Sequence, residues 1–180
     1  KNKDKNINFL DYGAGYNPIL IKKIIKKLSS KYKKKNFTAY CYDFYDKKKI
    51  NELNTNKKIV FKHIHKLRLS KIKSYNFCLV VDVIHHINID NKKKIIDLLK
   101  FLKKKSKLII IKDHLQYGFI SNLILIFMDL LGNYGDGTRI PTKYFNEHIF
   151  NNFVSQAKLK KIKMIKGISL YKPYWLILSN

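Results

Sequence analysis

A short segment with two glycines, Asp11-Tyr12-Gly13-Ala14-Gly15, follows an apolar run near the start of the chain. Glycines at this spacing, after a strand and just before a helix, let a ligand approach the backbone closely. A dinucleotide site begins in the same way, but this segment lacks the third glycine of that fingerprint. Asp11 would also repel a pyrophosphate and attract a cationic group. The segment therefore predicts a site for a ligand that carries positive charge and no phosphate.

Five histidines lie near the ends of predicted strands, namely His63, His65, His85, His86 and His114. Metal sites usually combine three or four ligands at defined spacing, with at least one acid or cysteine among them. Because no such spacing is present here, we expect no metal site. A histidine with its ordinary pKa of about 6.5 is mostly neutral at pH 7 and can accept a proton. His85, His86 and His114 are therefore candidates for a general base, although a core or capping role suits His85 and His86 equally.

The elements that must position these residues follow from the apolar pattern, which alternates strand-like and helical runs and is typical of an α/β fold. Residues 18–30 have helical spacing, with Asn17 as the expected cap and Pro18 at the first helical position. We expect strands at 7–12, 37–42, 58–64, 76–84, 107–112, 159–167 and 173–179, and further helices at 47–53, after Asp90, at 119–131 and at 146–157. The pattern predicts a three-layer sandwich, with a seven-stranded, mostly parallel sheet and an antiparallel C-terminal strand pair, in one domain over residues 1–180.

The Asp-x-Gly-x-Gly segment resembles motif I of the class I S-adenosylmethionine (SAM)-dependent methyltransferases. The run from Asn76 to Ile87 is similar to the family's fourth strand and the turn after it, often a hydrophobic run followed by Asp-Val-Leu-His-His-Ile. SAM carries an ammonium and a sulfonium group and no phosphate, in agreement with the charge of Asp11. Asn17 stands where the family usually has a third glycine. The resemblance implies a Rossmann-like methyltransferase with SAM as cofactor and S-adenosylhomocysteine (SAH) as product.

The resemblance also implies a role for each matching residue. The glycine loop would wrap the methionine part of the cofactor, and Asp43 would accept both ribose hydroxyls, since one carboxylate can accept two O–H donors. Asp82 and Val83 would lie beside the methionine end, and His85, His86 and His114 would face the substrate. The full set of expected cofactor-binding residues is Asp11, Tyr12, Gly13, Gly15, Asn17, Asp43, Phe44, His65, Asp82 and Val83.

Residues 115–158 form the region in which these enzymes differ, and we expect them to select the methyl acceptor. The apolar helix expected at 119–131 would be either a lid over the substrate or an ordinary core helix, and its composition favours the core helix. Methyl transfer mainly needs alignment of the acceptor with the methyl group and exclusion of water, because the sulfonium is already activated. Proximity can therefore supply most of the rate, and an obligatory general base is not required.

The net charge of +26 would attract phosphate backbones and anionic membranes. All but two of the 38 basic residues are lysines, the exceptions being Arg68 and Arg139. Surfaces that recognise nucleic acid normally use arginine for bidentate contacts, so a general compositional bias is the favoured explanation. The motif Asn-Pro-Pro-Tyr, which many enzymes that methylate exocyclic base nitrogens carry after strand four, is also absent from the sequence.

These observations favour methyl transfer to a small-molecule or lipid-like acceptor. One alternative is an RNA- or DNA-modifying methyltransferase that uses the lysines as an electrostatic track. Another is a non-catalytic binding module on the same scaffold, since the helices that commonly precede strand one in this family are not present in the sequence. A nicotinamide-dependent reductase is disfavoured by Asp11.

The two cysteines, Cys41 and Cys78, lie in apolar runs, which excludes a disulfide scaffold and suits a reducing compartment. No stretch reaches the roughly 18 apolar residues that a membrane-spanning helix needs. We therefore expect a cytoplasmic protein.

Overall fold

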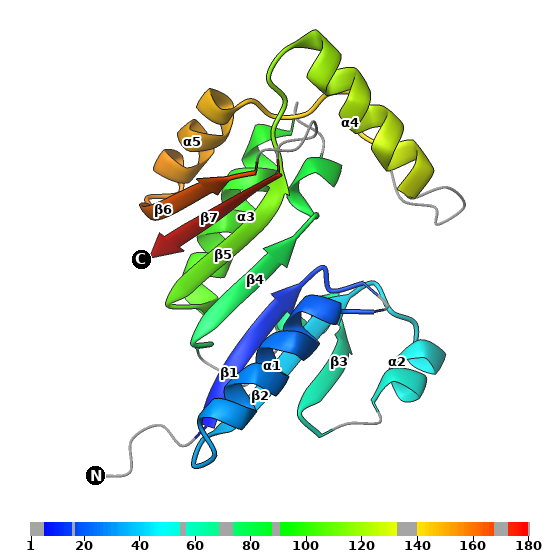
Figure 1. Cartoon of the computed structure of the whole chain (residues 1–180), viewed down its shortest axis with the longest axis vertical. Coiled ribbons are helices and arrows are strands. Elements are labelled where there is room, and N and C mark those ends of the chain that lie inside the picture. Colours follow the sequence, from blue (N-terminus) through cyan, green and yellow to red (C-terminus); the bar gives the residue numbers. More distant parts are fainter. Residues whose placement is uncertain are drawn as a thin grey trace. The chain divides into compact units, whose positions relative to one another are not determined.

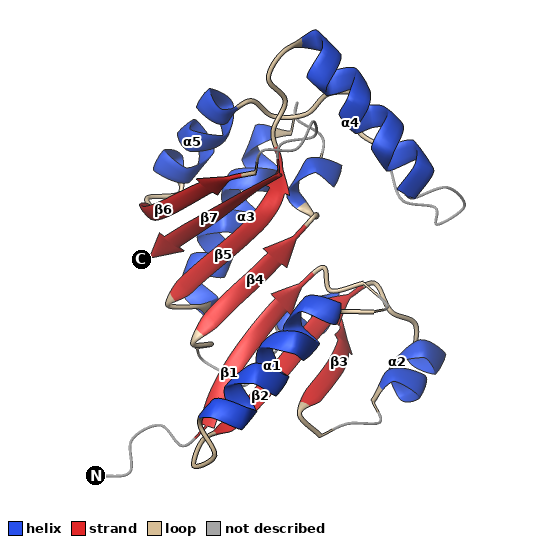
Figure 2. Ribbon diagram, viewed as in Figure 1, coloured by secondary structure: helices blue, strands red, loops and turns tan. Residues whose placement is uncertain are grey.

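The computed structural model describes residues 6–15, 17–54, 57–68, 74–87, 91–132, 140–167 and 173–179. The described strands form one seven-stranded sheet in the order β3-β2-β1-β4-β5-β7-β6 (Figure 2). Their bounds are β1 (Asn6–Tyr12), β2 (Asn36–Asp43), β3 (Ile59–His63), β4 (Phe77–Val81), β5 (Leu108–His114), β6 (Lys160–Lys166) and β7 (Pro173–Ser179). The sheet is mostly parallel, whereas β7 is antiparallel to both β5 and β6. The expected α/β fold is confirmed.

Helices flank the sheet (Figure 1). They are α1 (Ile19–Lys31), α2 (Lys47–Leu53), α3 (Lys92–Lys105), α4 (Phe119–Gly132) and α5 (Glu147–Gln156), with short 3-10 helices η1 (Ile64–Leu67) and η2 (Ile84–His86). None of the described helices combines the length and the apolar character needed to cross a bilayer.

The chain divides into two compact units. The first unit comprises Lys1–Val80 and Lys105–Lys107, and the second comprises Val81–Lys104 and Leu108–Asn180. A single domain over residues 1–180 stays a prediction.

In the first unit, β1, β2, β3 and β4 up to Val80 run parallel, and α1 lies on one side of them. Ile21 and Ile25 are the buried residues of α1, and the helix contacts β2. Strand β2 buries alternate residues, Phe37, Ala39 and Cys41 among them, as expected for a strand with a core face. The parallel register aligns the ends of β1 and β2, so that Tyr12 pairs with Tyr42. The residues that follow these two strands therefore emerge at the same edge of the sheet.

The start of α1 differs from the expected cap. Pro18 is the N-cap residue, and no side chain caps the helix. The side chain of Asn17 instead accepts a hydrogen bond from Lys22 Nζ at 3.1 Å. Asn17 is therefore not the cap, because its amide oxygen is engaged by a lysine one turn into the helix rather than by a backbone N–H.

In the second unit, β5 buries every second residue, namely Ile109, Ile111 and Asp113. The first two are ordinary core residues, but the third is a carboxylic acid that is only 1% exposed. Asp113, near the carboxyl end of β5, thus occupies a core-facing position in the alternating pattern of the strand.

One further boundary differs from expectation. The third strand stops at His63 because η1 begins at Ile64, so His65 belongs to a helical turn and not to a strand. Asp90, the expected start of the next helix, lies outside the described residues. The backbone N–H of Lys94 donates to the side chain of Asn91 at 3.1 Å, which satisfies one donor at the start of α3.

Candidate functional site

The glycine segment forms a tight turn at the carboxyl end of β1. Gly13 and Gly15 have φ angles of +71° and +62°, in the left-handed region that favours glycine. The N–H of Gly13 donates to the carbonyl oxygen of Tyr42 at 2.8 Å, which fixes the turn to the end of β2. A Cβ added to Gly15 would meet no atom within 4 Å, so the backbone angle and not a lack of space requires glycine there.

Asp43 joins this turn to the end of β2. Its Oδ2 accepts the N–H of Gly15 and its Oδ1 accepts the N–H of Phe44, both at 2.7 Å. The hydroxyl of Tyr45 donates to the carbonyl oxygen of Gly15 from the other side. Because each carboxylate oxygen has two acceptor positions, Asp43 can accept two further O–H donors while holding the turn.

Asp11 is the buried acid of this cluster, with only 4% of its surface exposed. Burial, together with the negative charge of Asp43, raises the pKa of Asp11 to about 7. Two carboxyl groups thus interact unfavourably at the end of β1 and β2 in the first unit. A bound cation would relieve this repulsion, whereas a pyrophosphate would increase it.

An exposed aromatic ring stands beside Asp43. Phe44 is 71% exposed, and its ring lies 6.2 Å from His63 and 6.3 Å from His65 between centroids. The two imidazoles stack on each other at 4.9 Å, which the turn of η1 makes possible. The Phe44 ring stands nearly perpendicular to both imidazoles, so this aromatic cluster leaves an exposed phenyl ring next to the acid.

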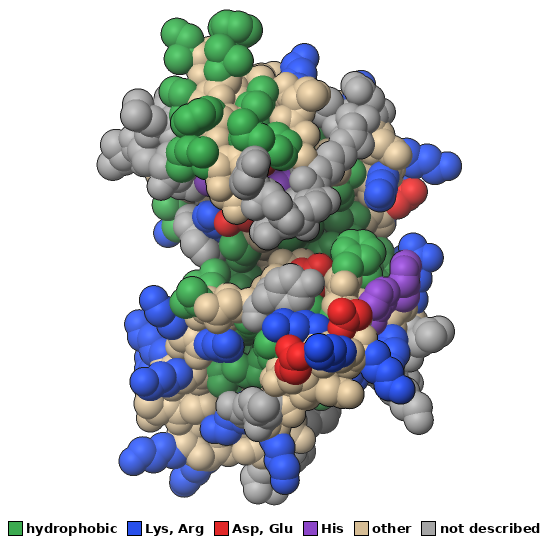
Figure 3. All heavy atoms as spheres, turned by 90° about the vertical axis from the view of Figure 1, so that its right-hand side faces the viewer, with side chains coloured by type: hydrophobic (Ala, Val, Ile, Leu, Met, Phe, Trp, Pro, Cys, Tyr) green, Lys and Arg blue, Asp and Glu red, His purple; other side chains and the backbone are tan. Residues whose placement is uncertain are grey.

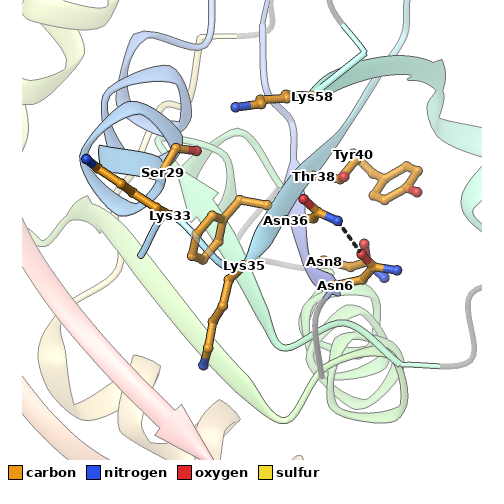
Figure 4. Close-up of a pocket in the computed structure, with 10 residues that line it drawn as sticks. Asn6, Asn8, Ser29, Lys33, Lys35, Asn36, Thr38, Tyr40 and Lys58 are labelled. Atoms are coloured by element: carbon orange, nitrogen blue, oxygen red, sulfur yellow. Dashed lines mark hydrogen bonds between the residues drawn. The ribbon is translucent and has the colours of Figure 1, made fainter. Parts of the chain in front are cut away.

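A different hollow in the first unit lies at the opposite end of the strands (Figure 4). It is lined by Asn6 and Asn36, the first residues of β1 and β2, whose side chains are joined by a 3.2 Å hydrogen bond. Ligands of open α/β sheets bind at the carboxyl ends of the strands. This hollow is therefore not the candidate site.

In the second unit, Asp82 follows β4 with a φ angle of +53°. Both of its carboxylate oxygens accept hydrogen bonds from Lys112 Nζ, at 2.7 and 2.5 Å, and His114 Nε2 lies 3.3 Å from Oδ1. Burial alone would raise the pKa of Asp82, but the hydrogen bonds and positive charge of His114 and Lys112 lower it. The next residue, Val83, is half-buried and accepts the N–H of His86 at 3.2 Å.

His85 is the most buried of the candidate histidines, at 2% exposure. Its Nδ1 is hydrogen-bonded to Oδ1 of Asp113, and the other oxygen of that acid accepts the N–H of Ile84 at 2.9 Å. Burial would lower the pKa of His85, but the charges and hydrogen bonds of Asp113 and Asp129 raise it to about 10. The ring also stacks on Tyr144 at 5.5 Å.

Asp129 is the site residue that sequence reasoning missed. It lies in α4, 43 positions after His86 in the sequence, and its Oδ2 is 3.4 Å from His85 Nε2. Candidate ligand atoms of His85, His86 and Asp129 all lie within 4.8 Å of one another. The signal available in the sequence was a single acid in an otherwise apolar helix, which indicates an inward-facing polar contact but not its partner.

Helix α4 has polar residues on its inward face and large apolar residues on its outward face. Its inward residues are Asn122, whose side chain accepts the N–H of Tyr144 at 2.9 Å, Leu125, which is 2% exposed, and Asp129. Its outward face is covered by large apolar side chains (Figure 3), namely Phe119, Ile120, Leu123, Phe127, Met128, Leu130 and Leu131. The expectation of an ordinary core helix is wrong. The large apolar side chains of α4 are exposed, and polar side chains are among those that contact the rest of the unit.

The sequence-predicted residues thus fall into two groups. The first unit brings together Asp11, Gly13, Gly15, Asp43 and Phe44, with His65 beside Phe44; Tyr12 is half-buried at the end of β1 and Asn17 is exposed. The second unit brings together Asp82, Val83, His85, His86 and His114.

No protein-family model matches the sequence, and no curated protein matches it. Solved structures do match. LepI in complex with SAH and a substrate analogue has a TM-score of 0.68 at 12% identity, over 99% of this chain and 43% of that one. The mitomycin 7-O-methyltransferase MmcR has a TM-score of 0.64 at 13% identity, over 97% and 49%. The magnesium protoporphyrin IX methyltransferase ChlM from Synechocystis PCC 6803 with bound SAH has a TM-score of 0.59 at 14% identity, over 97% and 74%.

The chain therefore spans less than half of the LepI and MmcR chains. Identities this low carry information on the fold alone. The chain has the fold of the class I SAM-dependent methyltransferases, in agreement with the motif resemblance.

Proposed function

We propose that this chain binds SAM and transfers its methyl group to a small-molecule or lipid-like acceptor. The observation that carries the proposal is the cluster of Asp11, Asp43 and the Gly13–Gly15 turn at the carboxyl ends of β1 and β2. It combines bare backbone with the carboxyl groups of Asp43 and Asp11, which suits a cationic ligand that has ribose hydroxyls. The solved structures with SAM or SAH bound support the same cofactor.

The proposed contacts follow from the geometry of each group. Asp43 accepts the ribose hydroxyls with the acceptor positions that the Gly15 and Phe44 N–H groups leave open. Phe44, which is in T-shaped contact with His65, offers its face to the adenine ring. Asp11, Tyr12, Gly13, Gly15 and Asn17 surround the methionine part in the first unit. The expected roles of Asp82 and Val83 in cofactor binding stay predictions from the sequence.

When bound, SAM supplies an activated methyl group on a sulfonium. The chain has to hold the acceptor in line with that methyl group and exclude water, which can supply most of the rate. A general base is a secondary part of the proposal. His85 does not suit this role, because Nδ1 is bound to Asp113 and Nε2 points toward Asp129.

His114 suits the role of base better, with His86 as the second choice. Asp82 lies 3.3 Å from His114 Nε2, whereas His114 Nδ1 is buried, so an acceptor would reach this imidazole from the Nε2 side next to Asp82. The acceptor class rests on the solved structures of MmcR and ChlM, which act on mitomycin and on magnesium protoporphyrin IX.

Calorimetric titration with SAH tests the cofactor assignment. We expect Asp43→Ala to weaken SAH binding by about 1.5–3 kcal/mol, the scale for lost hydrogen bonds to a charged group, or roughly 10- to 150-fold in Kd. Asp46→Asn is the matched control. Asp46 caps α2 by accepting the N–H of Lys49, and asparagine caps equally well, so this variant removes a nearby charge without losing the cap.

Equal affinity of wild type and Asp43→Ala would contradict the ribose assignment, and no binding of SAH by the wild type would contradict the cofactor. Turnover is a separate question. Incubation with SAM and a metabolite extract should yield a product heavier by one CH₂, whereas SAH binding without any such product would indicate a non-catalytic binding module.

A further inference from the structure

We propose that His85, His86 and Asp129 bind a divalent transition-metal ion, with Asp113 as the residue that positions His85. This site lies wholly in the second unit and does not depend on the proposed methyl transfer. It also revises the expectation from sequence that no metal site is present. That expectation rested on spacing along the chain, and Asp129 enters the cluster only through the fold.

The distance between two of the ligand atoms fits a shared metal ion. Zinc binds histidine nitrogen and carboxylate oxygen at about 2.0–2.2 Å, so two such ligands at a tetrahedral angle lie about 3.4 Å apart. His85 Nε2 and Asp129 Oδ2 are 3.4 Å apart. A direct N–H···O hydrogen bond would bring these atoms to about 2.9 Å. The observed separation is therefore longer than a usual hydrogen bond and matches two ligands of one ion. The same two groups also form the long hydrogen bond that helps to raise the pKa of His85.

A buried carboxylate orients the imidazole of His85, as is usual for a metal-bound histidine. Metal-bound histidines almost always donate their other ring N–H to a carboxylate or a carbonyl group, which fixes the ring and its tautomer. Asp113, which is 1% exposed, occupies that position on Nδ1 and is itself held by the N–H of Ile84. Nε2 is thereby directed at Asp129, the side on which His86 also lies, with a ring-centroid distance of 4.0 Å from His85.

The donor atoms of this cluster suit a transition-metal ion. Two imidazoles and one carboxylate suit zinc and its neighbours in the transition series, whereas magnesium and calcium prefer oxygen ligands alone. Three protein ligands are typical of sites that keep a position for water or an exogenous oxygen. The ion would connect η2, which carries both histidines, to the last turns of α4.

Zinc titration of tag-free, chelator-treated protein by calorimetry tests the proposal, with Co²⁺ absorption as a spectroscopic readout of the ligand geometry. We expect one zinc ion per chain and a tetrahedral Co²⁺ spectrum. Asp129→Asn and His86→Gln should each weaken zinc binding more than about 100-fold. Asp113→Asn should weaken it by about 10- to 100-fold, the usual range for an outer partner of a ligand.

The matched control is the double variant His63→Gln/His65→Gln, which removes the other close pair of histidines, stacked at 4.9 Å in the first unit. It should bind zinc as the wild type does. No stoichiometric zinc binding would overturn the proposal, and so would wild-type affinity in folded Asp129→Asn or loss of binding in the control. Circular dichroism of each variant checks the fold.

SAH titration of the same variants separates the two proposals. SAH binding by a wild type that binds no zinc would overturn only the metal site. Zinc binding without SAH binding would overturn only the proposed cofactor.

Discussion

At the scale of single residues, Asp11 is the group whose charge state should control the first unit. Its pKa is raised from 3.8 to about 7 by burial and by Asp43. Between these values the folded state binds more protons than the unfolded state, so the free energy of unfolding falls as the pH rises from about 4 to 7. A shift of this size corresponds to about 4 kcal/mol.

Asp11→Asn should remove this fall in the free energy of unfolding with rising pH. We expect urea denaturation to give a higher free energy of unfolding for the variant than for wild type at pH 8, by up to about 4 kcal/mol, and nearly equal values at pH 4. Asp97→Asn, an exposed acid on α3, is the control and should show no such pH-dependent difference. A constant gap between Asp11→Asn and wild type at both pH values would contradict the assignment.

At the scale of elements, α4 permits a comparison between one buried and one exposed apolar residue. Leu125 is 2% exposed and Phe127 is 58% exposed on the same helix. Leu125→Ala should lower the free energy of unfolding by about 2–5 kcal/mol, since it leaves a cavity. Phe127→Ser should change it by less than about 0.5 kcal/mol. Thermal or urea denaturation measures both, and an equal loss in the two variants would show that the outward face of α4 is covered in solution.

Elements with a strong local pattern were predictable from the sequence. Helix α2 has the expected bounds of 47–53, and Asp46 caps it locally by accepting the N–H of Lys49. The candidate site was predictable where it follows a strand end, as for Asp43 and Asp82. Whether these residues bind the cofactor stays a prediction.

Other features could not be read from local pattern. The composition of α4 predicts a buried helix, yet its exposed face is apolar, because inward contacts are made by Asn122 and Asp129. Asp113 carried a usable signal, since it continues the buried alternation of Ile109 and Ile111 in β5. The approach of Asp129 to His85 depends on tertiary packing alone.

At the scale of the whole molecule, the net charge of +26 should make stability depend on salt. Repulsion among surface lysines opposes the compact state, and salt shortens its range from about 30 Å at 0.01 M to about 8 Å at 0.15 M. We expect Tm to rise with NaCl over this range by roughly 2–4 °C for each 1 kcal/mol of repulsion that is relieved. A fall in Tm would indicate that specific ion pairs outweigh the repulsion.

The same charge bears on the RNA- or DNA-modifying alternative. A strongly cationic protein binds nucleic acid non-specifically at low salt, and such binding falls steeply as salt rises. Binding to tRNA or duplex DNA would therefore support a nucleic-acid substrate only if part of it persists at physiological salt.

The exposed apolar face of α4 should affect the heat capacity change on unfolding. Its seven large outward side chains already contact water in the folded chain, so unfolding hydrates less new apolar surface than the composition suggests. Because newly hydrated apolar surface is what raises the heat capacity on unfolding, that increment should be small for a protein of this length. The stability curve is then flatter, and for a given maximum the temperatures of cold and heat denaturation lie further apart.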